Sequence, residues 1–101
     1  MIIRVDAAGE IRVDEHDVFT DFHVEDSAGF STADLAATMG EDTRADGEYL
    51  WIAETAVRHW LSGRIDETWD EGFSGMFAYA RSKGWTNDAG THLRSHVEHP
   101  D

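Results

Sequence analysis

The sequence contains no cysteine, a single proline and only 8 lysine and arginine residues among 101. The absence of cysteine excludes disulfides, a thiol nucleophile and thiolate metal ligands. The scarcity of basic residues argues against nucleic acid or an anionic membrane as a partner, because both require a positively charged surface. Apolar runs are only a few residues long, whereas about 20 residues are needed to span a bilayer. We therefore expect no nucleic-acid partner and no membrane contact.

Acidic residues, in contrast, are abundant, and 21 aspartates and glutamates give a formal net charge of -13. Disordered acidic chains are poor in aromatic residues, but this sequence is 11% aromatic and 41% hydrophobic. Its length suits one hydrophobic core. We expect one folded acidic domain covering residues 1–101. A soluble, cytoplasmic protein is expected, because the first residues lack the basic and apolar regions of a signal peptide.

Alternation of apolar and polar residues predicts four strands. The runs 3–6 and 11–14 each alternate apolar with charged residues, and a turn containing Gly9 joins them as a hairpin. A third extended run covers residues 18–24. The stretch 91–98 alternates again and predicts a C-terminal strand.

The middle of the chain predicts three helices. The first begins after Ser31, a good N-cap residue, and ends at Gly40. The second is predicted over residues 47–62, with Asp46 as its cap and a wide apolar arc. The third covers residues 67–83, with Asp66 as its cap, and carries a stripe of large apolar side chains.

The end of the third helix has the most specific local signal in the chain. Gly84 suits the left-handed conformation that follows many helices, and Trp85 can pack back on Ala80 in a Schellman motif. The order of elements is therefore β-β-β-α-α-α-β. We predict an α+β domain in which three helices pack on one face of a small antiparallel sheet, formed by the N-terminal hairpin, the third strand and the C-terminal strand.

The run 42–47 resembles the start of a calcium-binding loop, with acidic residues at its first and fifth positions and a glycine at its sixth. The third position, which should supply a ligand, is Arg44. The twelfth position, which should be a bidentate glutamate, is Ala53. We expect no calcium site.

Whether the three C-terminal histidines can share a metal ion depends on the local secondary structure. On a helix, His92 and His96 would lie about 6 Å apart and could bind one ion together with Asp88. On a strand, the same spacing is about 13 Å, which is too long for one ion. Since the alternation favours a strand, we predict no metal site at His92, His96 and His99, and no cofactor.

Candidate acid–base or ligand-binding groups are His16, His23 and His59. His16 lies within the carboxylate-rich run 14–17, where a histidine flanked by carboxylates could act as a general base, but a solvated turn between two strands is the favoured explanation. His23 and His59 could serve a pocket between the helix at 67–83 and the sheet, for which we expect an aromatic lining of Trp60, Trp69, Phe73 and Tyr79. No nucleophile elbow, phosphate loop or zinc-protease motif is present, so no catalytic residue is assigned.

Candidate partner-binding residues lie on the second and third predicted helices. Trp51 falls in the polar arc of the second helix near Arg58, and exposed tryptophans are frequent interface anchors. The N-terminal hairpin could equally well cover this side chain. Gly72 and Gly75 lie beside Tyr79 in the third helix. Since glycine within a helix costs about 1 kcal/mol relative to alanine, we expect a close approach there, by a neighbouring helix in the favoured interpretation and otherwise by a second subunit or a ligand.

The sequence leaves several functions open. A non-enzymatic interaction or regulatory domain is favoured, one that binds a protein partner with a basic surface by electrostatic attraction. The alternative is a small ligand-binding domain or enzyme with the aromatic-lined pocket described above. A third hypothesis is self-association into a homodimer through Trp51 or the glycine strip.

Overall fold

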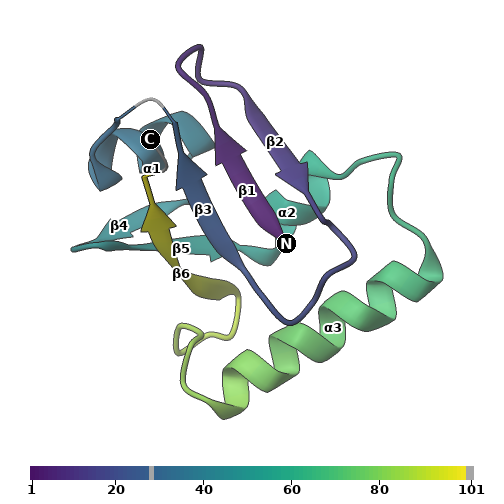
Figure 1. The fold of residues 1–101 in the computed structure, drawn as a ribbon. Coiled ribbons are helices and arrows are strands. Elements are labelled where there is room, and N and C mark those ends of the chain that lie inside the picture. Colours follow the sequence, from purple (N-terminus) through teal and green to yellow (C-terminus); the bar gives the residue numbers. More distant parts are fainter. Residues whose placement is uncertain (28, 100–101) are drawn as a thin grey trace.

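The computed structural model describes residues 1–27 and 29–99 (Figure 1). Three helices and one six-stranded sheet form an α+β fold, the class that the sequence predicts. In chain order the elements are β1 (Ile2–Val5), β2 (Ile11–Asp14), β3 (His23–Asp26), α1 (Thr32–Met39), β4 (Arg44–Asp46), β5 (Tyr49–Ala53), α2 (Glu54–Trp60), α3 (Glu67–Ser82) and β6 (His92–Glu98).

The sheet is mixed, which corrects the expectation of a small antiparallel sheet. Its strand order is β2-β1-β3-β6-β5-β4. The predicted hairpin of β1 and β2 is present, but β3 lies parallel to β1, and β6 lies parallel to β3. The reason is the connection at residues 15–22, which returns the chain to the end of the sheet where β1 begins before β3 starts (Figure 1). The extended run predicted over residues 18–24 is mostly wrong, because β3 covers only His23–Asp26 and residues 18–22 belong to this connection. On the other side of the sheet, β5 pairs antiparallel with both β4 and β6.

The helix predicted over residues 47–62 is wrong in its first half. Strands β4 and β5 form a hairpin there, with Gly47 at a φ of 60° in the turn, and α2 covers only Glu54–Trp60. Residues 49–52 are aromatic or branched and alternate between buried and more exposed, which suits a pleated strand. Asp46 does not cap a helix. Its carboxylate accepts a hydrogen bond from Trp51 Nε1 at 3.2 Å.

The signals at the ends of α1 and α3 are confirmed. The side chain of Ser31 accepts a hydrogen bond from the backbone in the first turn of α1, and that of Asp66 does the same in α3. After α3, Gly84 has a φ of 78° and the backbone N–H of Trp85 donates to the carbonyl of Ala80 at 2.9 Å. That bond and the one from Gly84 to the preceding turn form the predicted Schellman motif.

The two faces of the sheet differ, and this corrects the prediction that all three helices pack on one face. Helices α1 and α2 bury Leu35, Met39 and Val57 against one face, while α3 runs across the ends of the strands (Figure 1). The residues that the sheet contributes to this core include Ile3, Val5, Val13, Val24, Leu50, Ile52 and Leu93. The opposite face, here called the bare face, is covered by no helix within the described residues.

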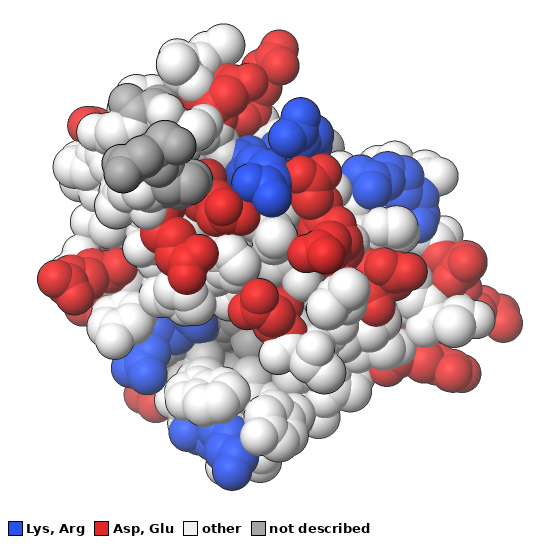
Figure 2. Space-filling model, viewed as in Figure 1, with Lys and Arg blue, Asp and Glu red and all other residues white. Residues whose placement is uncertain are grey.

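Figure 2 shows the bare face, where acidic and basic side chains are interspersed and a mostly uncharged area lies toward the lower left, flanked by basic side chains. The longest helix, α3, has 16 residues and carries several charges. Among the residues that the structure describes, no helix combines the length and apolar character needed to cross a bilayer.

Candidate functional site

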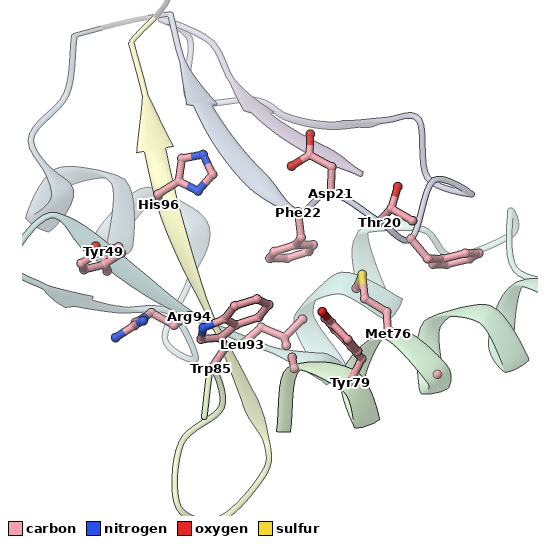
Figure 3. Close-up of a pocket in the computed structure, with 13 residues that line it drawn as sticks. Thr20, Asp21, Phe22, Tyr49, Met76, Tyr79, Trp85, Leu93, Arg94 and His96 are labelled. Carbon is pink, nitrogen blue, oxygen red and sulfur yellow. The ribbon is translucent and has the colours of Figure 1, made fainter. Parts of the chain in front are cut away.

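A cleft of about 650 Å³ opens where the second half of α3 meets the bare face of the sheet (Figure 3). One wall comes from α3, another from the loop before β3, and the third from β5 and β6. The lining residues are Phe19, Thr20, Asp21, Phe22, Tyr49, Gly75, Met76, Tyr79, Ala80, Trp85, Leu93, Arg94 and His96. The sequence predicts a pocket between this helix and the sheet, and of the four aromatic residues expected to line it, Tyr79 does so.

Exposed aromatic side chains gather around this cleft. Tyr49 is 41% exposed, Tyr79 57% and Trp85 42%, and all three belong to the lining. The Schellman turn explains part of this, because it returns the chain over the end of α3 and brings Trp85 edge-on to Tyr79, with 6.0 Å between ring centroids. Apolar side chains left in water around a concavity are typical of binding surfaces.

The polar groups of the cleft lie on opposite sides of it. The guanidinium of Arg94 lies over the Tyr49 ring at 4.8 Å from its centroid and forms no ion pair within the described residues. Asp21 lies across the aromatic groups from it, in the upper part of Figure 3. The cleft therefore offers a cation at one side and a carboxylate at the other.

The amino group of Met1 fixes the loop that carries Asp21. It donates hydrogen bonds to the carbonyl oxygens of Val18 at 2.8 Å and Asp21 at 2.6 Å. Burial lowers the pKa of this amino group below its ordinary value of 8.0, against the opposing effect of nearby carboxylates. These bonds connect the start of β1 to the wall of the cleft.

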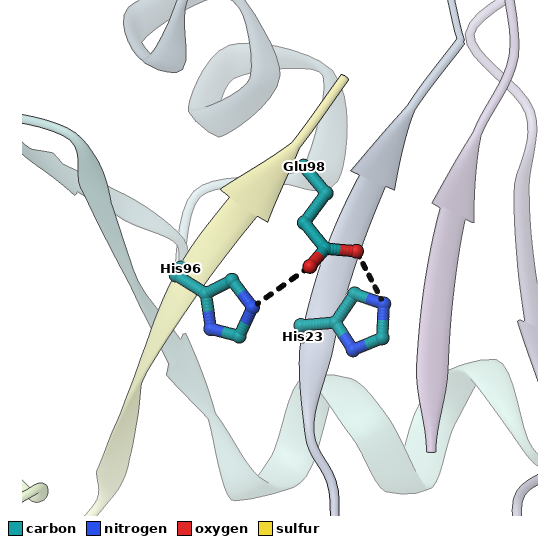
Figure 4. Close-up of side chains that lie close together, drawn as sticks. All are labelled: His23, His96 and Glu98. Atoms are coloured by element: carbon teal, nitrogen blue, oxygen red, sulfur yellow. Dashed lines mark ion pairs between the residues drawn. The ribbon is translucent and has the colours of Figure 1, made fainter. Parts of the chain in front are cut away.

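A cluster of two imidazoles and a carboxylate lies next to the cleft on the bare face (Figure 4). The Nε2 atom of His23 lies 3.2 Å from one carboxylate oxygen of Glu98, and the Nε2 atom of His96 lies 3.5 Å from the other. The two imidazole rings stack with centroids 5.3 Å apart and an angle of 15° between their planes. His96 belongs to both the cluster and the cleft lining.

A repeated tripeptide explains how the chain builds this cluster. Residues 23–25 and 96–98 both read His-Val-Glu. Strands β3 and β6 are parallel, and their register pairs Val24 with Val97 and Glu25 with Glu98. Because side chains alternate along a strand, both valines face the core and both His/Glu pairs face the bare side. This repeat is the sequence signal that could have revealed the cluster, but only together with the parallel pairing.

Further carboxylates surround His23. Its Nδ1 atom lies 3.3 Å from Asp21, and its Nε2 atom lies 3.5 Å from Glu25. Arg4 holds Glu25 at 3.1 Å and Asp14 at 2.5 Å. The hydrogen bond to Asp14 raises the pKa of Arg4, and the charge of Glu25 adds to this effect.

His92 and His96 lie on strand β6, as predicted, His99 follows its last residue, and the structure separates the three side chains. His92 Nε2 lies 2.9 Å from the carbonyl oxygen of Asp42, while His99 Nδ1 lies 3.2 Å from the buried carboxylate of Asp26. Only His96 of the three reaches the cluster, and its partner imidazole comes from β3. No metal site was expected because the sequence suggested one only at His92, His96 and His99, and it gave no sign that His23 lies beside His96.

The other candidate acid–base residues lie away from this site. The ring of His16 lies 3.4 Å from Arg64, and its carbonyl accepts a hydrogen bond from Trp69 Nε1 at 2.6 Å. His59 is exposed on α2. Of the three candidates, only His23 lies beside the cleft.

Two of the candidate partner-binding residues line the cleft, and the others lie outside it. Gly75 and Tyr79 line the cleft, and Trp51 is half-buried on the bare face of β5. Gly72 instead faces the ring of Phe19.

Arg58, the remaining candidate, is occupied inside the molecule. It pairs with Asp70 at 2.6 Å and with Glu54 at 3.1 Å. Its guanidinium also lies over the ring of Phe73, at 5.3 Å from the centroid. It therefore connects α2 to α3, and its role in partner binding stays a prediction.

The aromatic residues expected in the pocket have other roles. Trp69 and Phe73 are buried in the core with stacked rings, and Trp60 is partly buried against it.

The chain matches no protein-family model, and no curated protein and no solved structure matches it.

Proposed function

We propose that this protein is a small-ligand-binding domain whose cleft takes a molecule with an apolar, ring-containing body and a carboxylate group. The observation that carries the proposal is the gathering of Tyr49, Tyr79 and Trp85 around one concavity. The cleft volume of about 650 Å³ falls within the range of roughly 300–1,000 Å³ typical of small-molecule sites. The proposal concerns binding and names no reaction.

The ligand's acid group is inferred from Arg94. Its guanidinium has no ionic partner within the described residues and lies at the edge of the cleft. A planar guanidinium suits bidentate hydrogen bonding to a carboxylate. Asp21 on the far side disfavours a second anionic group there and suits a hydrogen-bond donor of the ligand.

The test is a panel of aromatic carboxylic acids screened by thermal shift and by tryptophan fluorescence, with the matching amides as comparison compounds. We expect an acid to raise the melting temperature and to perturb Trp85, and its amide to bind at least about tenfold more weakly, since one charged hydrogen-bonding pair contributes about 1.5–3 kcal/mol.

Matched variants define the site. Arg94→Gln should weaken binding of the acid, whereas Arg44→Gln removes a charge from exposed β4, outside the cleft, and should leave it unchanged. Gly75→Leu should block binding, because a Cβ at this position meets no atom within 4 Å and the added side chain can enter the cleft. Binding that survives both Arg94→Gln and Gly75→Leu would refute the proposal.

A protein partner is the second candidate, and the composition of the cleft rim favours it. Tyrosine, tryptophan and arginine are the residue types enriched at interface hot spots, and the net charge of -13 would attract a basic partner. Such binding should weaken steeply between low and moderate salt. Binding that shows no such salt dependence would count against it.

A further inference from the structure

We propose that His23, His96 and Glu98 form a binding site for a divalent transition-metal ion, with zinc as the expected occupant. The three side chains offer two imidazole nitrogens and a carboxylate oxygen that lie within 4.8 Å of one another. This proposal rests on the cluster alone and holds whether or not the cleft binds a carboxylic acid.

The distances suit one ion. Zinc bound tetrahedrally at about 2.0–2.1 Å places its ligand atoms about 3.4 Å apart. The Nε2 atoms of His23 and His96 lie 3.2 Å and 3.5 Å from the oxygens of Glu98. Figure 4 shows both rings directing these nitrogens toward the carboxylate from neighbouring strands. Little movement is therefore needed to exchange these contacts for bonds to an ion.

The donor set selects the class of ion. Imidazole suits zinc, copper, iron and nickel, whereas calcium and magnesium prefer sites made of oxygen atoms. Two histidines and one carboxylate are also the protein ligands of a known class of zinc site, which leaves a fourth position open. Since His96 is exposed and also lines the cleft, a water molecule can complete the coordination.

The surroundings orient the imidazole of His23 and favour a cation. The Nδ1 atom of His23 lies 3.3 Å from Asp21, which leaves Nε2 directed at the cluster. A carboxylate behind a ligating histidine is the usual support of a zinc site. Glu25 adds negative charge at 3.5 Å from His23, and its ion pair with Arg4 fixes its position.

Burial makes one side of the site rigid and leaves the other open. His23 is 7% exposed and stacks on His96. His96 and Glu98 are exposed, with side chains 51% and 54% accessible. An ion can therefore enter from the bare face without any rearrangement of the core.

The experiment titrates tag-free, metal-stripped protein with Zn²⁺ by calorimetry. We expect one ion per chain and an affinity that falls at least about tenfold in His96→Gln and in Glu98→Gln. His59→Gln serves as the matched control, because His59 is an exposed histidine on α2 away from the cluster, and this variant should bind Zn²⁺ as the parent does. His23→Gln should lose binding as well, but its burial requires circular dichroism to show that the variant is folded.

Substitution of Co²⁺ for Zn²⁺ gives a readout that a merely structural effect would not change. Visible absorption of the bound Co²⁺ should report four-coordinate geometry in the parent and lose this signature in Glu98→Gln. The proposal is overturned if Glu98→Gln and His96→Gln bind Zn²⁺ as tightly as the parent, or if His59→Gln weakens binding as much as they do. Arg94→Gln and Gly75→Leu should leave Zn²⁺ affinity unchanged, which separates failure of the metal site from failure of the cleft.

Discussion

The two faces of the sheet carry different kinds of residue although they belong to the same strands. The covered face contributes fully buried aliphatic side chains such as Ile3, Val24 and Ile52, sealed by α1 and α2. The bare face presents charged, imidazole and aromatic side chains, among them the histidine cluster and one wall of the cleft. Because side chains alternate along each strand, one residue packs into the core while the next faces the cleft or the histidine cluster.

Strands β3 and β6 show this separation most clearly. In each His-Val-Glu tripeptide, the valine packs into the core while the histidine and glutamate lie on the bare face. Substitutions on the two faces should therefore affect different properties.

The largest expected effect is on the covered face. Ile52→Ala removes a fully buried side chain and should lower the free energy of unfolding by about 2–5 kcal/mol. Arg94→Ala, on the bare face of the neighbouring strand, should lower it by less than about 1 kcal/mol, chiefly through the lost contact with Tyr49. Urea denaturation of both variants measures this difference. Equal losses of unfolding free energy would show that the two faces do not differ in their contribution to stability.

The two glycines of α3 extend the comparison to a packed and an open position of one helix. A Cβ at position 72 would lie 2.3 Å from the Phe19 ring, whereas one at position 75 meets nothing within 4 Å. Gly75→Ala should stabilise the protein by up to about 1 kcal/mol through helix propensity. Gly72→Ala should destabilise it by about 1 kcal/mol, because overpacking outweighs the same gain. Equal stabilisation of both variants in thermal unfolding would show that the Phe19 ring moves aside freely.

A smaller effect is expected at the charged contact between α2 and α3. Burial lowers the pKa of Arg58, but hydrogen bonds to Asp70 and Glu54 outweigh burial and raise it overall. The Asp70 side chain is 53% exposed, so solvent screening limits the pair to about 0.2–1 kcal/mol. A double-mutant cycle with Arg58→Met and Asp70→Asn should give a coupling in this range that shrinks in high salt. Coupling that persists unchanged in high salt would contradict this account.

The smallest expected effect is a dependence on pH from the Met1 amino group. Its folded-state pKa is lowered by burial below 8.0, so the unfolded chain binds more protons between the folded-state pKa and 8.0. Stability from this group should therefore increase as pH rises through that window. Chemical denaturation at several pH values measures this increase. A chain with one serine added before Met1 should lack it, and an identical pH dependence in both chains would assign the effect to other groups.

Local signals predicted part of the fold. Ser31, Asp66 and Gly84 mark helix ends through hydrogen bonds made within a few residues, and the structure confirms all three. The hairpin of β1 and β2 is equally local. In contrast, residues 49–53 satisfy both a helical and a strand pattern, and only pairing with β6 decides for the strand.

Less of the candidate site than of the fold could be predicted from the sequence. The helix at 67–83 and the sheet were expected to enclose a pocket, and a cleft lies at that junction with Gly75 and Tyr79 in its lining. The pairing of His23 with His96 was not predictable, because the two residues lie far apart in sequence and meet only through the parallel register of β3 and β6.

The sequence determined the α+β class, the acidic composition, the ends of α1 and α3 and the alternation of side chains along each strand, because each depends on composition or on neighbours a few residues away. The tertiary structure alone decided the strand order, the mixed pairing, the placement of α3 across the strand ends and the meeting of the two His-Val-Glu segments. Those features depend on which distant segments pair, and that choice is set by the packing of the whole core rather than by any local preference.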